Sequence, residues 1–420
     1  MSFELTKKTK KKFIWFPEKG LPAVVLCLCA VSILAIGAAG NKPLIGDESW
    51  IEKVQLFFKA RYVGSQMLYA GVGFIIMLLV GLVPQKYYKQ FANFIYWASV
   101  SVLALVLLVG TRAGGTKGWF NIPLLSSLMG AESTIQPSEF AKLGVILYLA
   151  RLISKHEGNI DTWGKLIPIA AYFALPFGLV ILQPDYGTAI VYLVVFIVLL
   201  FVGGMHWKLF AISGGAMAAS LPLVWFFLFG EVQKNRFAVF FNPALDALNN
   251  GAAQHVAKSK LSIGSGMFFG RGIFDTGSMG QLNFLAVKYT DFIFAIIGEA
   301  FGFLGVIMVI LLFCWLLYRL LILARSCRDE FGTLIIAGVL SMQFVHVFEN
   351  IGMTMGVMPV TGIPLPFISV GGSALMANMI SIGVVLSVIR YTPRPEAERL
   401  LPQGHLLRVQ KKRRPLPTME

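Results

Sequence analysis

Charged residues are scarce in this chain, and cysteine and histidine are scarcer still. Only 14% of the 420 residues are Asp, Glu, Lys or Arg, whereas 56% are hydrophobic, and the mean hydropathy is +0.73. Soluble domains carry about 25% charged residues. The composition therefore excludes an ordinary soluble protein and indicates a polytopic membrane protein.

The few cysteines, histidines and serines form none of the familiar catalytic motifs. The four cysteines (Cys27, Cys29, Cys314 and Cys327) fall in apolar runs or at a cytoplasmic end, so no exterior disulfide is expected. The five histidines form no His-Glu-x-x-His pattern, and no serine lies in a Gly-x-Ser-x-Gly elbow. A glycine-rich stretch, 264–272, lacks the strand and the Lys-Ser/Thr of a phosphate loop, and we interpret it as flexible exterior backbone or a turn close to lipid.

Long hydrophobic runs are what the chain has instead. A span needs roughly 20 apolar residues, and about ten segments qualify, which predicts an all-α membrane protein whose first helix is retained. The segments are Leu21–Ala39, Met67–Val83, Ala92–Gly110, Phe140–Ile153, Leu166–Leu182, Thr188–Gly204, Leu209–Gly230, Phe292–Ala324, Phe331–Met358 and Ala374–Ile389.

Basic residues predict the orientation, because Lys and Arg are retained on the cytoplasmic side. With the N-terminus inside, 23 of the 36 lie in cytoplasmic segments. Both termini are then cytoplasmic, and one long exterior loop, 231–290, joins the seventh and eighth spans. We expect a single membrane domain, 21–390, between basic tails at 1–20 and 391–420. The net charge of +15 comes mostly from these tails, which suits anionic lipid and does not point to nucleic acid.

Five carboxylates and amines within or beside the apolar runs are functional candidates, since ionisable groups are costly in a membrane. Glu139 and Lys142 are three residues apart, so they share a helical face and can neutralise each other. Asp291 lies where the exterior loop meets the eighth span. Glu299 follows eight residues later, and helical spacing would place it on nearly the same face. Glu349 lies in the ninth span.

Six motifs in this order resemble the SEDS (shape, elongation, division, sporulation) family. They are Gly118–Phe120, Gln136–Lys142, Gln183–Thr188, Ile263–Gly266, Thr290–Ala295 and Met358–Ser369. The sequence Ile-Pro-Leu-Pro at 363–366 resembles the elongation branch, RodA, more than the division branch, FtsW. Val370 stands where the family usually has Tyr, and Leu285–Tyr289 replaces the usual Leu-Pro-Glu-x-His.

The resemblance implies an enzyme that polymerises lipid II into peptidoglycan strands outside the cytoplasmic membrane, together with a class B penicillin-binding transpeptidase. Two other functions stay open. A flippase for lipid II or another polyprenyl lipid would depend on mid-membrane charges, and a scaffold would only recruit the transpeptidase. Glycines at 352, 356 and 362 near the ninth span are candidates for packing a partner helix or for bending the chain.

Polymerisation requires a base for a sugar hydroxyl and a cation for the departing pyrophosphate. Asp291 is the candidate base, because reduced solvation at the mouth of a span raises its proton affinity; capping of the following helix is the alternative. The candidates for substrate and pyrophosphate binding are Arg112, Lys117, Trp119, Arg236 and Lys258. The residues expected to shape the pocket are Gln136, Glu139, Lys142, Asp185, Glu299 and Ser369. No ligand cluster requires a metal, although a divalent cation bridging Asp291 and pyrophosphate is an open alternative.

Overall fold

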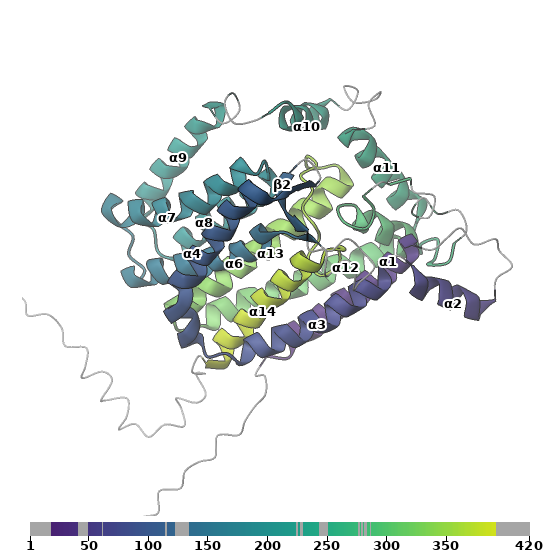
Figure 1. Cartoon of the computed structure of the whole chain (residues 1–420), viewed down its shortest axis with the longest axis horizontal. Coiled ribbons are helices and arrows are strands. Elements are labelled where there is room, and N and C mark those ends of the chain that lie inside the picture. The colour runs from purple at the N-terminus through teal and green to yellow at the C-terminus, as the bar shows by residue number, and fades with distance from the viewer. Residues whose placement is uncertain are drawn as a thin grey trace, which may run out of the picture.

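The computed structural model describes residues 18–40, 49–60, 62–113, 116–121, 134–223, 226, 230–242, 251–275, 278, 280, 284–285 and 287–391. Most of the two predicted basic tails lies outside these ranges. The architecture is helical, with one small sheet at the exterior side (Figure 1).

Each of the ten predicted spans is a helix. The helices are α1 (Gly20–Gly40), α3 (Val63–Leu82), α4 (Gln85–Val109), α6 (Pro137–Ile153), α7 (Trp163–Leu182), α8 (Tyr186–Val202), α9 (Trp207–Leu223), α12 (Ile293–Ser326), α13 (Glu330–Met355) and α14 (Gly372–Tyr391). Seven of them, among the described residues, are long and apolar enough to cross a membrane. The other three, α6, α8 and α9, have 17 residues each.

The helices form an inner group surrounded by lipid-facing ones. The most hydrophobic stretches of α13 and α14 are 78% and 72% buried, against 22% for α3 and 28% for α4 and α7. α6 is buried along nearly its whole length, between α4, α13 and α14. This central position explains why a 17-residue helix with two buried charged side chains, Glu139 and Lys142, is stable there, since these groups meet protein instead of lipid.

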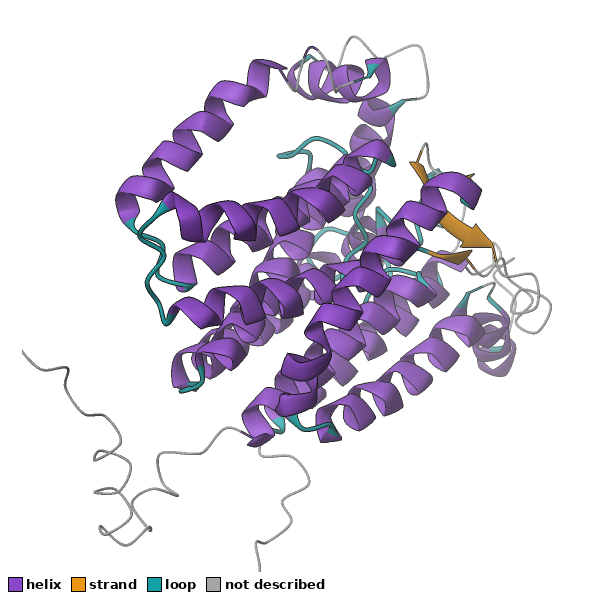
Figure 2. Cartoon of the chain, turned by 60° about the vertical axis from the view of Figure 1, so that its left-hand side comes forward, coloured by secondary structure: helices purple, strands orange, loops and turns teal. Residues whose placement is uncertain are grey.

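The predicted exterior loop and its neighbours contain more structure than we expected. The loop includes α10 (Glu231–Phe241) and α11 (Ala252–Ser265), and α2 (Trp50–Lys59) lies between the first two spans. An antiparallel sheet of β1 (Thr111–Ala113), β2 (Thr116–Asn121) and β3 (Thr134–Ile135) follows α4, and Figure 2 shows it in orange. The strands and α2 escape sequence analysis because ten residues or fewer are too short to show a period.

A break in α12 rules out one of our two interpretations of the glycine-rich stretch 264–272, that it is flexible exterior backbone. Gly302 has a φ of 64°, so the helix is interrupted there, and glycine tolerates this conformation best. The N–H groups of Arg271 and Gly272 donate to the carbonyls of Glu299 and Ala300 at 2.9 and 3.0 Å. A Cβ on Gly266 would lie 1.9 Å from the carbonyl oxygen of Gly298. The stretch is therefore packed against protein backbone.

Candidate active site

The backbone before α12 is held by three hydrogen bonds to successive carbonyl groups, two from the segment between α13 and α14 and one from α13 itself. The N–H of Val370 donates to the carbonyl of Tyr289 at 2.9 Å. The hydroxyl of Ser369 donates to the carbonyl of Thr290 at 2.6 Å. The amide of Asn350 donates to the carbonyl of Asp291 at 3.0 Å. These bonds fix the backbone at Asp291 through carbonyl groups, and none of them involves the carboxylate of Asp291.

That carboxylate does not cap the helix. The N-cap of α12 is Phe292, and no side chain makes the capping hydrogen bond. The alternative that Asp291 is a helix cap is therefore wrong. In contrast, Asp185 does cap α8, because its Oδ1 accepts a hydrogen bond from the N–H of Thr188 at 3.1 Å.

The carboxylate of Asp291 has open space on one side and a cation in its surroundings. A Cβ on Gly362, where φ is +79°, would lie 3.5 Å from Oδ2 of Asp291, so this glycine leaves space beside the carboxylate. Arg236, on α10, donates to the carbonyl of Val360 at 3.3 Å. Burial raises the pKa of Asp291, and its hydrogen bond with Thr290 and the charge of Arg236 oppose this rise. A partly buried carboxylate with elevated proton affinity next to a cation suits general-base catalysis.

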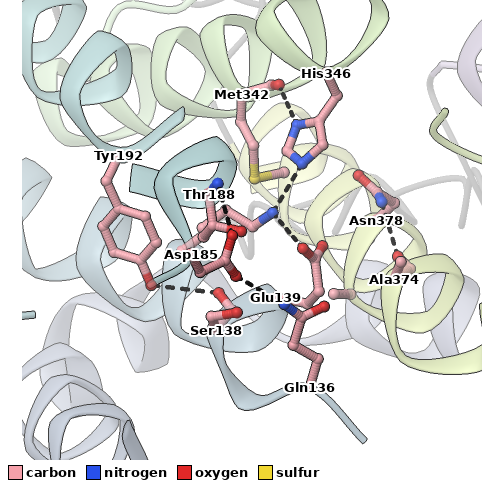
Figure 3. A network of polar contacts seen from close by, with 12 residues as sticks. Gln136, Ser138, Glu139, Asp185, Thr188, Tyr192, Met342, His346, Ala374 and Asn378 are labelled. Carbon is pink, nitrogen blue, oxygen red and sulfur yellow. Dashed lines mark hydrogen bonds and ion pairs between the residues drawn. The ribbon is translucent and has the colours of Figure 1, made fainter. Parts of the chain in front are cut away.

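A second polar cluster lies deeper, where α6 meets α13 (Figure 3). Lys142 donates to Oε1 of Glu139 at 2.7 Å, and both side chains are about 97% buried or more, which confirms the predicted pairing. The ammonium also lies 2.8 Å from Nε2 of His346, whose Nδ1 is 2.6 Å from the carbonyl of Met342. Since a carbonyl only accepts, Nδ1 carries the ring proton and Nε2 accepts from Lys142. The histidine is then neutral, and the cluster has no net charge.

The start of α8 joins this cluster to the surroundings of Asp291. Gln136 donates to Oδ2 of Asp185 at 2.9 Å, at the start of α6. Burial raises the pKa of Asp185, and the N–H of Thr188 counteracts it. A Cβ on Gly187 would lie 3.2 Å from the carbonyl oxygen of Thr361, in the segment that also contains Gly362. Packing of α8 on this segment therefore brings the cluster of Glu139, Lys142 and His346 close to the surroundings of Asp291.

Glu299 belongs to neither cluster. Its Oε2 accepts hydrogen bonds from Ser262 on α11 at 2.9 Å and from the N–H of Gly280 at 3.1 Å. Our expectation that helical spacing aligns Glu299 with Asp291 is wrong, because α12 begins only at Ile293. The structure places Glu299 as a support for the exterior segments that pack on α12.

The predicted cations are spread over the exterior side. Lys117 and Trp119 lie on β2, where the N–H of Lys117 donates to the carbonyl of Gln183 at 3.3 Å. Arg112 lies in β1, and its side chain is outside the described part of the structure. The ammonium of Lys258, on α11, lies 4.9 Å above the ring of Phe284. Among the candidates whose side chains are described, Arg236 is the one whose charge acts on Asp291.

Sequence reasoning missed the polar face of α13. Its buried polar residues recur with helical spacing: Gln343, His346, Asn350 and Thr354. Residues three and four apart lie on one helical face, and polar residues in a span face the protein interior, so this pattern was a usable signal. We had treated each histidine as an isolated residue. Within the described residues, no group of three His, Cys, Asp or Glu side chains could hold a metal ion.

Comparisons with known proteins place the chain among related sequences and structures. Residues 43–394 match the FtsW, RodA and SpoVE family, described as "Cell cycle protein". "Peptidoglycan glycosyltransferase MrdB" of Escherichia coli is 32% identical over 387 residues, 91% of this chain and 97% of the relative. "Stage V sporulation protein E" of Bacillus subtilis is 32% identical over 390 residues, 92% of this chain and 99% of the relative.

Solved structures agree with the sequence comparison. One chain, from a study of the "structural coordination of polymerization and crosslinking by a peptidoglycan synthase complex", has a TM-score of 0.69 and 30% identity, and the match covers 89% of this chain and 97% of that one. The crystal structure of the rod shape determining protein RodA of Thermus thermophilus has a TM-score of 0.63 and 27% identity, with coverages of 91% and 99%.

Proposed function

We propose that this chain, which belongs to the FtsW, RodA and SpoVE family of cell cycle proteins, uses Asp291 as the general base of glycan polymerisation. It is a multi-pass protein of the bacterial cytoplasmic membrane and a peptidoglycan glycosyltransferase that polymerises lipid II for cell elongation and shape. The observation that carries the assignment to Asp291 is its carboxylate, which is partly buried, is not used as a helix cap, and lies on a backbone fixed at three carbonyls.

The reaction joins two lipid-linked disaccharides. The oxygen of an acceptor sugar hydroxyl forms a bond to the anomeric carbon of the donor, and the bond from that carbon to undecaprenyl pyrophosphate breaks. The hydroxyl proton passes to Asp291, while the pyrophosphate leaves with its negative charge. Arg236 is the proposed cation for this leaving group, because guanidinium binds phosphate oxygens in a bidentate manner. Asp291 is also the residue that would hold a divalent cation, which would supply the alternative positive charge for the pyrophosphate, and assays with EDTA or added magnesium distinguish the two sources.

Purified protein and labelled lipid II test the assignment. We expect Asp291→Asn to lower polymerisation by about 10²-fold or more, because it removes the proton acceptor and keeps the shape. Asp275→Asn is the matched control, since Asp275 is another exterior carboxylate and pairs with Arg271 at 2.6 Å. Glycan ladders of normal length and rate from Asp291→Asn would refute the role of this residue.

The change in stability expected for Asp291→Asn has a definite sign. Because burial raises the pKa of Asp291 in the folded protein, ionisation costs stability as pH rises from the ordinary Asp value, about 3.9, through the raised one. At neutral pH a neutral asparagine removes this cost. The variant should therefore melt at the same temperature as the parent protein or higher, which separates lost chemistry from lost folding.

The flippase alternative finds less support in the described residues. A transport pathway requires charges that can move or exchange partners, whereas the carboxylate of Glu139 and the ammonium of Lys142 are buried and paired. The products formed from labelled lipid II distinguish the two functions. Glycan ladders demonstrate polymerisation, and translocation of labelled lipid II without ladders would favour the flippase.

The proposed partner is a single-span class B penicillin-binding transpeptidase. The glycines we considered for docking do not form a helix surface: Gly352 is buried, and Gly356 ends α13 with a φ of +73°. The exposed side of α13 instead carries Phe344, Phe348 and Met355, 50%, 56% and 47% exposed. We place the partner helix on this aromatic face. Cysteines introduced at Phe344 and Phe348 should cross-link to the partner, and the absence of any adduct would exclude this face.

A further inference from the structure

The short exterior helix α2 has a wider apolar face than the protein covers. At 100° per residue, five of its six apolar side chains span an arc of about 120°; they are Trp50, Ile51, Val54, Phe57 and Phe58. The sixth, Leu56, lies outside this arc and is half-buried. One edge of this arc packs inward: Phe57 is 8% exposed, and its ring fills the space beside Gly37. The rest is bare, with Trp50, Ile51 and Phe58 70%, 68% and 55% exposed.

A second bare apolar segment lies in the turn after α11. Met267 and Phe269 are 82% and 78% exposed, and Phe268 is 51% exposed and stacks on Phe303. This turn is fixed by the break in α12, because the N–H of Phe303 donates to the carbonyl of Met267 at 2.9 Å. The backbone of the turn is therefore fixed on the protein, although its apolar side chains are exposed.

The segment that follows the turn contacts α2. The ring of Phe274, which follows the turn, lies 5.5 Å from the ring of Trp50 and 6.3 Å from that of Phe57, both edge-to-face. The two exposed apolar segments are thus linked through Phe274, and we call their exposed residues together the exterior collar: Trp50, Ile51, Phe58, Met267 and Phe269.

The level of the collar along the membrane normal indicates what covers it. Gly302 lies about 24 residues before the cytoplasmic end of α12 at Ser326, a helical length of about 36 Å. The hydrocarbon core is about 30 Å thick, and the headgroups extend the bilayer to about 40–45 Å. The turn, which is bonded to Phe303 and Leu304 directly after Gly302, thus lies at the headgroup region of the exterior leaflet. There, tryptophan and other aromatic side chains are most stable.

We propose that the exterior collar inserts into the interface of the outer leaflet, and that lipid covers the apolar surface the protein leaves bare. The rest of α2 fits this placement, since its opposite arc carries Glu52, Gln55 and Lys59 for water and headgroups. Because the turn continues directly from α11, the contact would also hold the exterior loop at the membrane surface, where a lipid-linked sugar is presented.

Spin-label accessibility in nanodiscs of phosphatidylethanolamine and phosphatidylglycerol tests the proposal. The four native cysteines are replaced by serine, and single cysteines are introduced as Ile51→Cys and Phe269→Cys. Gln55→Cys, on the polar arc of α2, provides the matched water-facing control. A variant that keeps only Cys27, which is exposed on α1, provides the lipid-facing reference.

We expect nitroxides at 51 and 269 to collide with oxygen several-fold more than with a water-soluble nickel complex, as at Cys27, and the label at 55 to show the reverse. Equal nickel accessibility at 51 and 55 would overturn the proposal, because α2 would then stand in water. Protection at 51 that appears only when the transpeptidase or a second copy is added would also overturn it, in favour of a protein partner.

Discussion

Removing Lys142 should destabilise this protein more than removing any exposed charge, because Glu139 would remain buried without its cation. The two charges are 2.7 Å apart, with side chains 2% and 3% exposed. Breaking a buried pair costs about 3–5 kcal/mol, since it leaves an uncompensated charge in a low-dielectric interior. Lys142→Met keeps the length of the side chain but removes the charge and the hydrogen bond to His346.

A double-mutant cycle separates the pair from its surroundings. Glu139→Gln with Lys142→Met leaves no isolated charge, so the double variant should lose less stability than the sum of the single variants, with a coupling of about 0.5–3 kcal/mol. Each kcal/mol corresponds to about 1 °C for a chain of this length that unfolds as one unit. Lys142→Met alone should therefore lower the melting temperature by about 3–5 °C.

Melting of the purified variants in nanodiscs, together with their yield, provides the readout. The pair of Lys165 and Asp161 is the matched control: its atoms are also 2.7 Å apart, but the side chains are 33% and 42% exposed. Solvent screens such a pair, so Lys165→Met should have little effect. Additive losses from Glu139→Gln and Lys142→Met would refute the reasoning that the two residues act as a pair.

Substitutions at three further residues test the surroundings of Asp291. Arg236→Gln removes the charge that lowers the pKa of Asp291, so the acidic limb of the pH–rate profile should move to higher pH, whereas Arg236→Lys should leave it near its original place. Gly362→Ala adds a methyl group 3.5 Å from the carboxylate at a φ of +79°; we expect a lower rate of polymerisation and about 1 kcal/mol less stability, and unchanged ladders would show that the space beside Asp291 is not used. Ser369→Ala removes the 2.6 Å bond to the carbonyl of Thr290, worth about 1 kcal/mol, and kcat should fall more than KM rises; an effect on KM alone would contradict a positioning role.

The sequence alone identified Asp291 by its place at the end of a polar segment and by the family motif around it. It could not identify what holds that residue. Asn350, Ser369 and Val370 approach the backbone before α12 from positions 59 to 81 residues away in sequence, and no local pattern encodes such a contact. The contact of His346 with Lys142 was missed for the same reason, because the two residues are 204 positions apart, although the polar spacing along α13 marked His346 as an inward-facing residue.

What the sequence determined by itself is the set of ten helices, their alternating direction and the pairing of Glu139 with Lys142. Hydrophobic length and helical period are local properties, and a membrane forces every apolar run to satisfy its own backbone as a helix. Only the tertiary structure decided which helices are central, why Glu299 supports α11 instead of facing Asp291, and where α12 breaks. Those features depend on close approach between distant segments, such as the one that Gly266 and Gly302 permit, and packing of this kind is fixed by all the neighbours together.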